Sequence, residues 1–175
     1  MRKLQSENIL LRAMEATDVK LMYDWENDIS LWHLSGTVQP FSEYTLQEFV
    51  DMQGDIYTAK QLRLMIVAKE NTIGCVDLFE FDAINRRAGI GILISEKERN
   101  NGYAFEVIEL IINYSFNTLH LHQLYCNIIF DNEISLNLFK KHGFEICGCK
   151  KQWVKIGKVW KDEYILQLIN NEKEF

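Results

Sequence analysis

The sequence predicts an α/β domain in which a mixed sheet is flanked by helices. Three patterns lead to this prediction. Residues 88–94 form an uninterrupted apolar run, which is typical of a central strand covered on both faces. Apolar residues between 104 and 116 then recur at spacings of three and four, as they do along a helix packed on a core. Strand and helix patterns alternate along much of the chain, which favours helices layered on a sheet.

The composition is that of a folded domain with a substantial core. Of the 175 residues, 47% are hydrophobic. This length lies within the usual range of roughly 100–200 residues for one domain, so we expect a single domain over residues 1–175. The formal net charge of −6 argues against nucleic acid or an anionic membrane as the main partner.

The cysteines and the absence of targeting signals favour a cytoplasmic protein. Cys147 and Cys149 are separated by one residue, which is too close for the usual zinc spacing, and no His or Cys pair complements them. We therefore expect reduced thiols and no metal site. No signal peptide is visible, and no stretch reaches the roughly 20 apolar residues of a membrane span.

Local signals set the bounds of the predicted helices. Thr17 and Asp18 offer a side-chain N-cap for a helix that ends near Glu26. A later helix is predicted between Asn132 as its N-cap and Gly143 as a left-handed C-cap. The predicted helices cover residues 18–26, 45–52, 103–116 and 133–142.

Turn-forming residues separate the predicted strands. Glu70 and Asn71 predict a short turn between two strands, and Gly157 lies in the turn of a later hairpin. Residues 31–44 are rich in aromatic and turn-forming residues, which predicts an irregular loop. The predicted strands cover residues 8–12, 62–69, 72–81, 88–94, 123–130, 152–155 and 159–168.

The junction before the helix at Tyr103 has the features of a phosphate-binding site. The first amides of a helix lack internal partners and carry the positive end of its dipole, so they suit a pyrophosphate. Gly102 lets the backbone approach the phosphates without an intervening Cβ. Arg99 adds a positive charge, and the small Ala104 permits close contact.

Residues 99–104, Arg-x-x-Gly-x-Ala after a buried strand, resemble the acetyl-CoA pyrophosphate motif of the Gcn5-related N-acetyltransferases (GNAT). Residues 132–144 resemble the second CoA-contacting motif of that superfamily. Together the similar segments span nearly the whole chain in the family's order. Residues 9–18 and 154–166 are similar to its ribosomal-protein-acetylating branch, and residues 76–80, 85–88, 113–116 and 119–125 to its spermidine N-acetyltransferases.

The resemblance implies a GNAT fold and an acetyl-CoA co-substrate, with no metal required. The fold would be a mixed, mostly antiparallel sheet of about six to seven strands flanked by about four helices, with two central strands splayed around the cofactor. The implied cofactor-binding residues are Ile92, Leu93, Ile94, Arg99, Asn100, Asn101, Gly102, Tyr103, Ala104, Phe105, Asn132, Ser135 and Phe139.

The implied reaction is direct transfer of an acetyl group to an amine in a ternary complex. Strand amides near 92–94 would polarise the thioester carbonyl. An ammonium substrate must lose a proton before it attacks, so a base is needed. Glu80 falls where the spermidine enzymes place a substrate-contacting acid and is the leading candidate, with Asp77 and Asp82 behind it.

The proton donor to the departing thiolate is left open. The spermidine enzymes have a tyrosine with this proposed role at the position of Phe139, and phenylalanine has no ionisable proton. Ser135, Tyr125 or a bound water could take its place.

The acceptor amine is also left open. Gly89 stands where the spermidine branch has an acid, and residues 33–36 replace its Glu-Glu pair, so most polyamine-binding carboxylates are missing. The acceptor could be a polyamine, another small amine or a protein N-terminus. The alternative function is a catalytically degenerate acyl-CoA-binding module that acts as a sensor or interaction domain. Assembly into a homo-oligomer is open as well.

Overall fold

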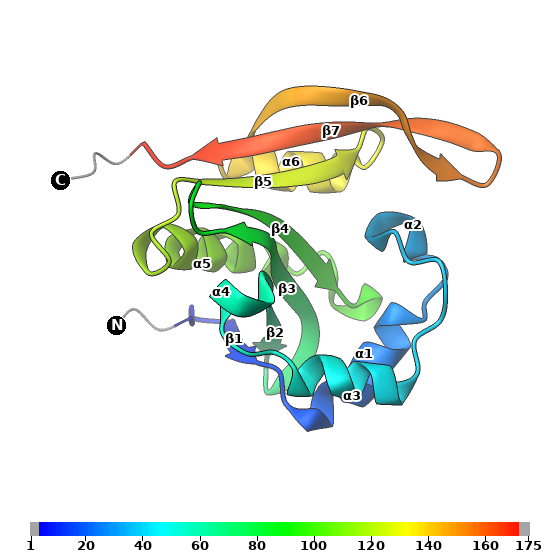
Figure 1. The fold of residues 1–175 in the computed structure, drawn as a ribbon, viewed down its shortest axis with the longest axis vertical. Coiled ribbons are helices and arrows are strands. Elements are labelled where there is room, and N and C mark those ends of the chain that lie inside the picture. Colours follow the sequence, from blue (N-terminus) through cyan, green and yellow to red (C-terminus); the bar gives the residue numbers. More distant parts are fainter. Residues whose placement is uncertain (1–3, 172–175) are drawn as a thin grey trace.

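A seven-stranded sheet runs through residues 4–171, which are the residues that the computed structural model describes (Figure 1). The strand order is β1-β2-β3-β4-β5-β7-β6, and every neighbouring pair is antiparallel except β4 and β5. This confirms the mostly antiparallel mixed sheet that the resemblance implies. The strands are β1 (Leu10–Ala13), β2 (Leu62–Ala68), β3 (Asn71–Asp82), β4 (Arg87–Ile94), β5 (Gln123–Ile129), β6 (Glu145–Ile156) and β7 (Val159–Ile169).

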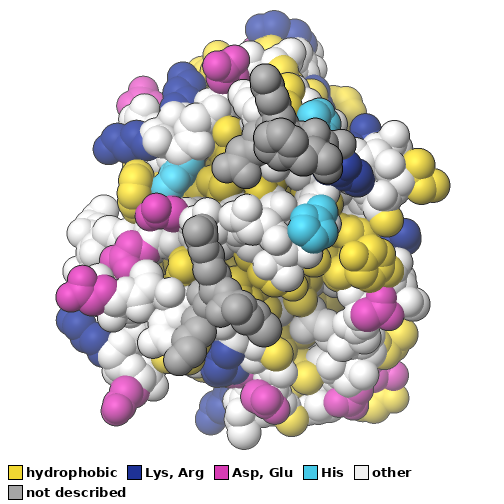
Figure 2. Space-filling model, turned by 90° about the vertical axis from the view of Figure 1, so that its left-hand side faces the viewer, with side chains coloured by type: hydrophobic (Ala, Val, Ile, Leu, Met, Phe, Trp, Pro, Cys, Tyr) yellow, Lys and Arg dark blue, Asp and Glu magenta, His cyan; other side chains and the backbone are white. Residues whose placement is uncertain are grey.

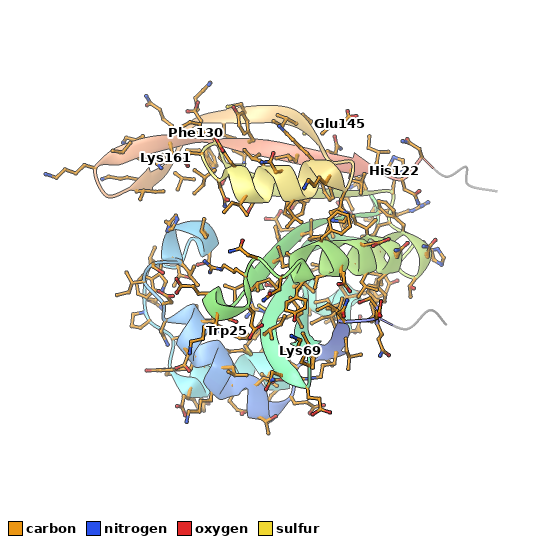
Figure 3. The ribbon with its side chains drawn as sticks, turned by 180° about the vertical axis from the view of Figure 1, so that it is seen from behind. Trp25, Lys69, His122, Phe130, Glu145 and Lys161 are labelled. Carbon is orange, nitrogen blue, oxygen red and sulfur yellow. The ribbon has the colours of Figure 1, made fainter. Side chains whose placement is uncertain are left out.

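Helices pack on both faces of this sheet. Figure 3 shows one helix lying across β5 and β7 and another beside β3 and β4. These are the last two helices of the described residues, and most of the earlier helices lie near the other half of the sheet (Figure 1). The α-helices of the described residues are α1 (Val19–Glu26), α2 (Trp32–Ser35), α3 (Glu43–Asp51), α4 (Ile56–Ala59), α5 (Tyr103–Asn117) and α6 (Glu133–Lys141).

The larger core packs α5 and α6 against the middle of the sheet. Val107, Ile108 and Ile111 form the buried stripe of α5 that the spacing predicts. They belong to the same cluster as Ile90 of β4 and Leu124 of β5, which are also buried. Each such side chain contributes about 1.5–3 kcal/mol by leaving water. This packing fixes β4, β5 and the start of α5 relative to one another.

The smaller core lies on the opposite face of β2 and β3. Met22 of α1 and Leu46 of α3 are buried together with Met65 and Cys75 of the strands. Successive side chains of a strand point to opposite faces, so Cys75 meets α1 and α3 while its neighbour Val76 joins the larger core. The two cores hold helices on both faces of the sheet.

The first helix begins after Asp18, as predicted, but the expected side-chain cap is missing. Asp18 occupies the N-cap position of α1, but its side chain makes no cap hydrogen bond there. Its carboxylate instead accepts hydrogen bonds from both terminal nitrogens of Arg12, at 2.7 and 2.8 Å, and from the Glu15 amide at 2.9 Å. A charged partner from β1 therefore outcompetes the local cap.

The irregular loop predicted over 31–44 contains regular structure at both ends. Residues 32–35 form α2, and α3 begins at Glu43, before the predicted position 45. Ser42 caps α3, because its Oγ accepts a hydrogen bond from the Thr45 amide at 3.1 Å. The single-turn helices α2 and α4 are too short to show a helical period, which is why about four helices were expected and six are found among the described residues.

The late strand predicted over 152–155 starts much earlier, at Glu145. Most of β6 is exposed, so it lacks the apolar alternation by which a strand is recognised in a sequence. Pairing with β7 holds it, with register shifts between Ile146 and Gly148 and between Lys150 and Val154. Tertiary pairing rather than sequence pattern makes this strand.

The predicted turns are largely confirmed. Gly143 ends α6 in the left-handed region, with φ of 85°, and Gly157 has φ of 61° in the hairpin between β6 and β7. The first hairpin turn lies one residue earlier than predicted, because Ala68 pairs with Asn71 across a turn of two left-handed residues. No helix within residues 4–171 has the length and apolar character to cross a membrane.

Candidate active site

β4 and β5 are parallel neighbours that pair over only three residues. Arg87–Gly89 of β4 pairs with residues 123–125 of β5, and beyond this point the strands diverge (Figure 1). Residues 90–94 continue beside β3 alone, and residues 126–129 beside β7 alone. We call the region between these two stretches the wedge. In residues 90–94, the backbone N–H and C=O groups on the wedge side of β4 have no partner strand, so they can bind a ligand.

The loop after β4 leads directly to the N-terminus of α5. Gly102 is the N-cap of α5 and is left-handed, with φ of 82°, and Asn100 is left-handed as well. Arg99 donates a hydrogen bond from Nε to the Ile94 carbonyl at 3.1 Å, and Asn101 donates from Nδ2 to the Glu98 carbonyl at 3.2 Å. The loop is thereby held against the end of β4, with the first amides of α5 beside it.

The space around Gly102 is open. A Cβ added to Gly102 would meet no atom within 4 Å, so the local fold requires glycine for its backbone angle rather than for room. Tyr103 is buried and Ala104 half-buried, whereas Phe105 is 43% exposed. The residues predicted for the pyrophosphate therefore surround an accessible helix N-terminus.

The residues predicted at and within α6 differ in how far they are buried. Asn132 caps this helix, because its Oδ1 accepts a hydrogen bond from the Ser135 amide at 3.2 Å. Both side chains are half-buried. Phe139 is 3% exposed and packs edge-to-face on Phe144, with ring centroids 5.1 Å apart. The Phe139 ring is a core group and offers no proton.

The two groups of predicted cofactor-binding residues are linked by one aromatic contact. Phe105, in the first turn of α5, lies against His142 at the end of α6, with ring centroids 4.1 Å apart. Asn132 is at the other end of α6, which at nine residues is about 13 Å long. The predicted set is therefore elongated, as a long cofactor requires.

A cavity of about 640 Å³ lies between the first helices and the sheet. Gly91, Ile92 and Leu93 of β4 belong to its wall, so the cavity meets the wedge along this strand. Figure 3 shows Trp25 on α1, beside the end of β4. The walls from α1, α3 and the connecting segments are mainly apolar: Trp25, Leu31, Leu34, Phe41, Leu46 and Phe49.

One charged cluster interrupts these apolar walls. Arg63 of β2 donates two hydrogen bonds to Asp77 of β3, at 2.8 and 2.9 Å, and one to Oε1 of Glu26 at 2.6 Å. Its guanidinium also lies over the Phe49 ring, 5.4 Å from the centroid. Burial alone would lower the pKa of Arg63, but Asp77 and then Glu26 raise it above its ordinary value. Arg63 is therefore a permanent cation in the cavity wall.

Phe79 closes one side of the cavity. Its ring covers Gly89, where an added Cβ would lie 2.2 Å from Cε2 of the ring. The ring also contacts Tyr125 of β5 edge-to-face, with centroids 6.0 Å apart. Gly89 and Tyr125 form the last residue pair before the wedge. Phe79 therefore separates the cavity from Tyr125.

Glu80 reaches Tyr125 because β3 is irregular at this point. The register with β4 shifts between Phe79 and Asp82, and Glu80 has a left-handed φ of 50°. The Tyr125 hydroxyl donates a hydrogen bond to Oε2 of Glu80. Burial, followed by this hydrogen bond, raises the pKa of Tyr125 well above its ordinary value, so the phenol keeps its proton.

The other two candidate bases are engaged elsewhere. Asp77 is held on both oxygens by Arg63. Asp82 accepts hydrogen bonds from the amides of Ile84 and Asn85, at 3.1 and 2.9 Å, and so stabilises the turn before β4. Among the described carboxylates considered as bases, Glu80 alone is held by a neutral group rather than a cation or a turn.

The buried thiols are poor nucleophiles. Burial raises the pKa of Cys75, in the cavity wall, and of Cys126, on β5, to about 12 in each case. Both are therefore protonated at neutral pH. The part of the chain that the structure describes contains no group of three or more His, Cys, Asp or Glu side chains placed to hold a metal ion.

The sequence predictions did not include Glu26 and Arg63, which only the fold brings together. The signal in the sequence was Arg63 itself, an arginine inside the apolar strand 62–68. A charge on a half-buried strand needs a partner of opposite sign. Which of the many acidic residues supplies it cannot be read from spacing, because Glu26 lies on a separate helix.

Comparisons with known proteins show what the chain is similar to. The model of the acetyltransferase (GNAT) domain family matches residues 8–145. Spermidine N(1)-acetyltransferase from Vibrio cholerae is 27% identical over 144 residues, which cover 79% of this chain and 80% of that protein.

Two solved structures of the Vibrio cholerae spermidine N-acetyltransferase have the same fold. The complex with CoA and spermine has a TM-score of 0.86 at 24% identity, with 94% of this chain and 96% of that chain covered. A dodecameric structure in an intermediate state has a TM-score of 0.80 at 25% identity, with 94% and 95% covered.

Proposed function

The chain belongs to the GNAT family and is an acetyl-CoA-dependent N-acetyltransferase, and we propose that its acceptor amine meets the thioester where the cavity joins the wedge. The observation that carries this proposal is the shared strand: Gly91, Ile92 and Leu93 line the cavity and also form the open edge of β4. A substrate in the cavity and a cofactor along β4 would therefore be adjacent.

The residues of the wedge suit the chemistry of acetyl-CoA. The unpaired edge of β4 offers amides and carbonyls to the amide groups of pantetheine, and Ile92, Leu93 and Ile94 are the residues we propose for this contact. The loop 99–105 offers a cation and helix amides to the pyrophosphate. Asn132 and Ser135 would complete the site at the start of α6, and Phe139 would support it from the core.

Glu80 is the base that we propose for the incoming ammonium. Because Phe79 lies between Glu80 and the cavity, Glu80 would accept the proton through water in the wedge, after which the amine nitrogen attacks the thioester carbonyl. A new N–C bond forms as the C–S bond breaks, and the thiolate leaves and takes up, through water, the second proton that the nitrogen loses. We propose that the Ser135 hydroxyl donates a hydrogen bond to the departing sulfur, and that Tyr125 holds Glu80 in place. Amides on the edge of β4 would stabilise the developing negative charge on the carbonyl oxygen.

The wider properties of the chain are proposals too. The continuous seven-stranded sheet supports one domain over residues 1–175. The free state of all four cysteines fits a cytoplasmic location. Nucleic acid and membranes are not among the proposed partners; on the face drawn in Figure 2, basic side chains are interspersed with acidic ones rather than gathered in a patch.

Assembly into a homo-oligomer is supported by the dodecameric relative and by the β6–β7 hairpin. Trp153, Val159 and Trp160 of this hairpin are each more than half exposed, at 59, 58 and 54%. Exposed apolar groups of this size are typical of a surface that a protein partner covers. Light scattering of the purified chain would give its assembly state.

The proposed function is tested by measuring release of the CoA thiol from acetyl-CoA with a panel of amines. The panel contains monoamines, polyamines and peptides with a free N-terminus, and mass spectrometry identifies the acetylated product. We expect turnover that depends on the amine and saturates. Tight acetyl-CoA binding without turnover on any amine would instead identify a binding module that acts as a sensor or interaction domain.

A further inference from the structure

We propose that the preferred acceptor carries one positive charge on an otherwise apolar body, and is not a polyamine. This inference rests on the proposed function of the cavity as the acceptor site. It deepens that function because it follows from the charges and shape of the cavity wall, which the family's activity alone does not specify.

The charge of the cavity wall matches a single ammonium group. Arg63, Glu26 and Asp77 together carry one formal negative charge, since two carboxylates face one guanidinium. Asp77 uses both oxygens for Arg63, whereas Glu26 uses only Oε1. Oε2 of Glu26 accepts no hydrogen bond from the described residues, and the Glu26 side chain is 21% exposed. Glu26 is therefore the place where the cavity can receive a cation.

The rest of the wall offers no further carboxylate to a second cation. Among the described residues that line the cavity, Glu26 and Asp77 are the only acids. Leucine, phenylalanine and tryptophan side chains form most of the remaining surface. A second ammonium would lose its water without gaining a carboxylate, which is a large penalty in an apolar site. An alkyl or aryl group in the same place would gain from leaving water.

The shape of the cavity also limits how far an acceptor can extend on the side of Phe79. Phe79 occupies the space beside Gly89, so the cavity ends at its ring rather than continuing to Tyr125 and Glu80. The volume of about 640 Å³ is within the usual range for a small ligand. A long chain of several ammonium groups would have to displace this ring to extend past it.

A matched pair of acceptors tests the inference without any change to the protein. Pentylamine and cadaverine have the same carbon chain, and cadaverine adds a second ammonium at its far end. We expect kcat/KM for pentylamine to exceed that for cadaverine by about tenfold or more. Phenethylamine should be acetylated as well, because its ring suits the aromatic walls. Equal or higher kcat/KM for cadaverine would overturn the inference.

A second experiment tests whether the ammonium group of the acceptor contacts Glu26. Glu26→Gln should raise KM for pentylamine by about tenfold, with the Kd for acetyl-CoA unchanged. Glu48→Gln is the matched control, because Glu48 is exposed on α3 and outside the cavity wall, and it should change neither constant. An unchanged KM in a folded Glu26→Gln variant would refute the role of Glu26. If that variant does not fold, the pair of amines still decides.

Failure of the proposed function and failure of the monocationic acceptor would give different results. If the chain binds acetyl-CoA but acetylates no amine, the proposed function is wrong, and this inference falls with it. If the chain acetylates cadaverine or spermidine better than pentylamine, the proposed function stands and only the monocationic acceptor is wrong.

Discussion

Phe79 fills the space that a side chain at Gly89 would need, since a Cβ there would lie 2.2 Å from the ring. The two residues face each other across β3 and β4, as a direct pair in the register. The acid that the resemblance to the spermidine branch implies at this position is absent, and an aromatic ring from the neighbouring strand occupies the space. At this point the cavity that we propose for the acceptor has an apolar wall.

Gly89→Ala should lower the free energy of unfolding by about 1–3 kcal/mol, because the added methyl group overpacks against Phe79. Thermal or urea unfolding measures this effect. Gly91→Ala is the matched control on the same strand, since its Cβ would lie at an ordinary 3.7 Å from the same ring. Equal stability of the two variants would contradict the close fit between Phe79 and Gly89.

Glu80→Gln should lower kcat by about a hundredfold or more, because the proposed base is lost. Tyr125→Phe should have a smaller effect, about tenfold, since Glu80 keeps its charge and loses only its hydrogen-bond donor. Steady-state kinetics and acetyl-CoA binding are measured for both. If Glu80→Gln retains full kcat, then Glu80 is not the base.

The Glu80–Tyr125 pair also predicts a distinct titration. Because the pKa of Tyr125 is raised, its phenol should stay protonated at about pH 10, where an exposed tyrosine ionises. Tyrosinate absorbance should therefore be the same in the wild type and in Tyr125→Phe at that pH. In Glu80→Gln the pKa of Tyr125 should fall, because the negative charge beside the phenol is gone. A tyrosinate signal near pH 10 that is lost in Tyr125→Phe would contradict this.

The Arg12–Asp18 ion pair predicts how stability depends on acid. Burial alone would raise the pKa of Asp18, but the hydrogen bonds from Arg12 and the Glu15 amide together lower it. The pair therefore stabilises the fold fully above the ordinary aspartate pKa of about 4, and the effect is lost as the pH falls through the lower folded-state value.

Asp18→Asn should accordingly cost about 3 kcal/mol at neutral pH, since Arg12 loses its charged partner. The difference from the wild type should shrink as the pH is lowered. Urea unfolding at several pH values measures it. Asp24→Asn, an exposed change on α1, is the control and should behave as the wild type. A constant difference across the acid range would contradict the lowered pKa of Asp18.

Gly102→Trp should abolish acetyl-CoA affinity, because it strains a left-handed residue and fills the open space beside the helix N-terminus. Gly102→Asn should retain much of the affinity, since asparagine tolerates this conformation. Isothermal calorimetry measures both. Gly157→Trp is the control, because Gly157 is left-handed and equally open but lies in the β6–β7 turn. Unchanged affinity in Gly102→Trp would refute the pyrophosphate site.

The features that could be predicted from the sequence are mostly local. The α5 stripe follows from the spacing of its apolar residues, and the caps at Asn132 and Gly143 are set by their own side chain or backbone. The glycine loop before α5 is local too. These signals, with the family resemblance, were enough to predict the fold and the place of the cofactor.

Only the tertiary structure decided the acceptor side of the site. Arg63 meets Glu26 and Asp77 from three separate elements, and Phe79 reaches Gly89 across two strands. The wedge itself exists because pairing between β4 and β5 stops after Gly89. The sequence around each of these residues carries little information about such contacts, because the contacting residues are far apart in the chain. The sequence alone therefore determined where acetyl-CoA is expected to bind, and the packing of distant residues decided the shape and charge of the cavity that we propose for the amine.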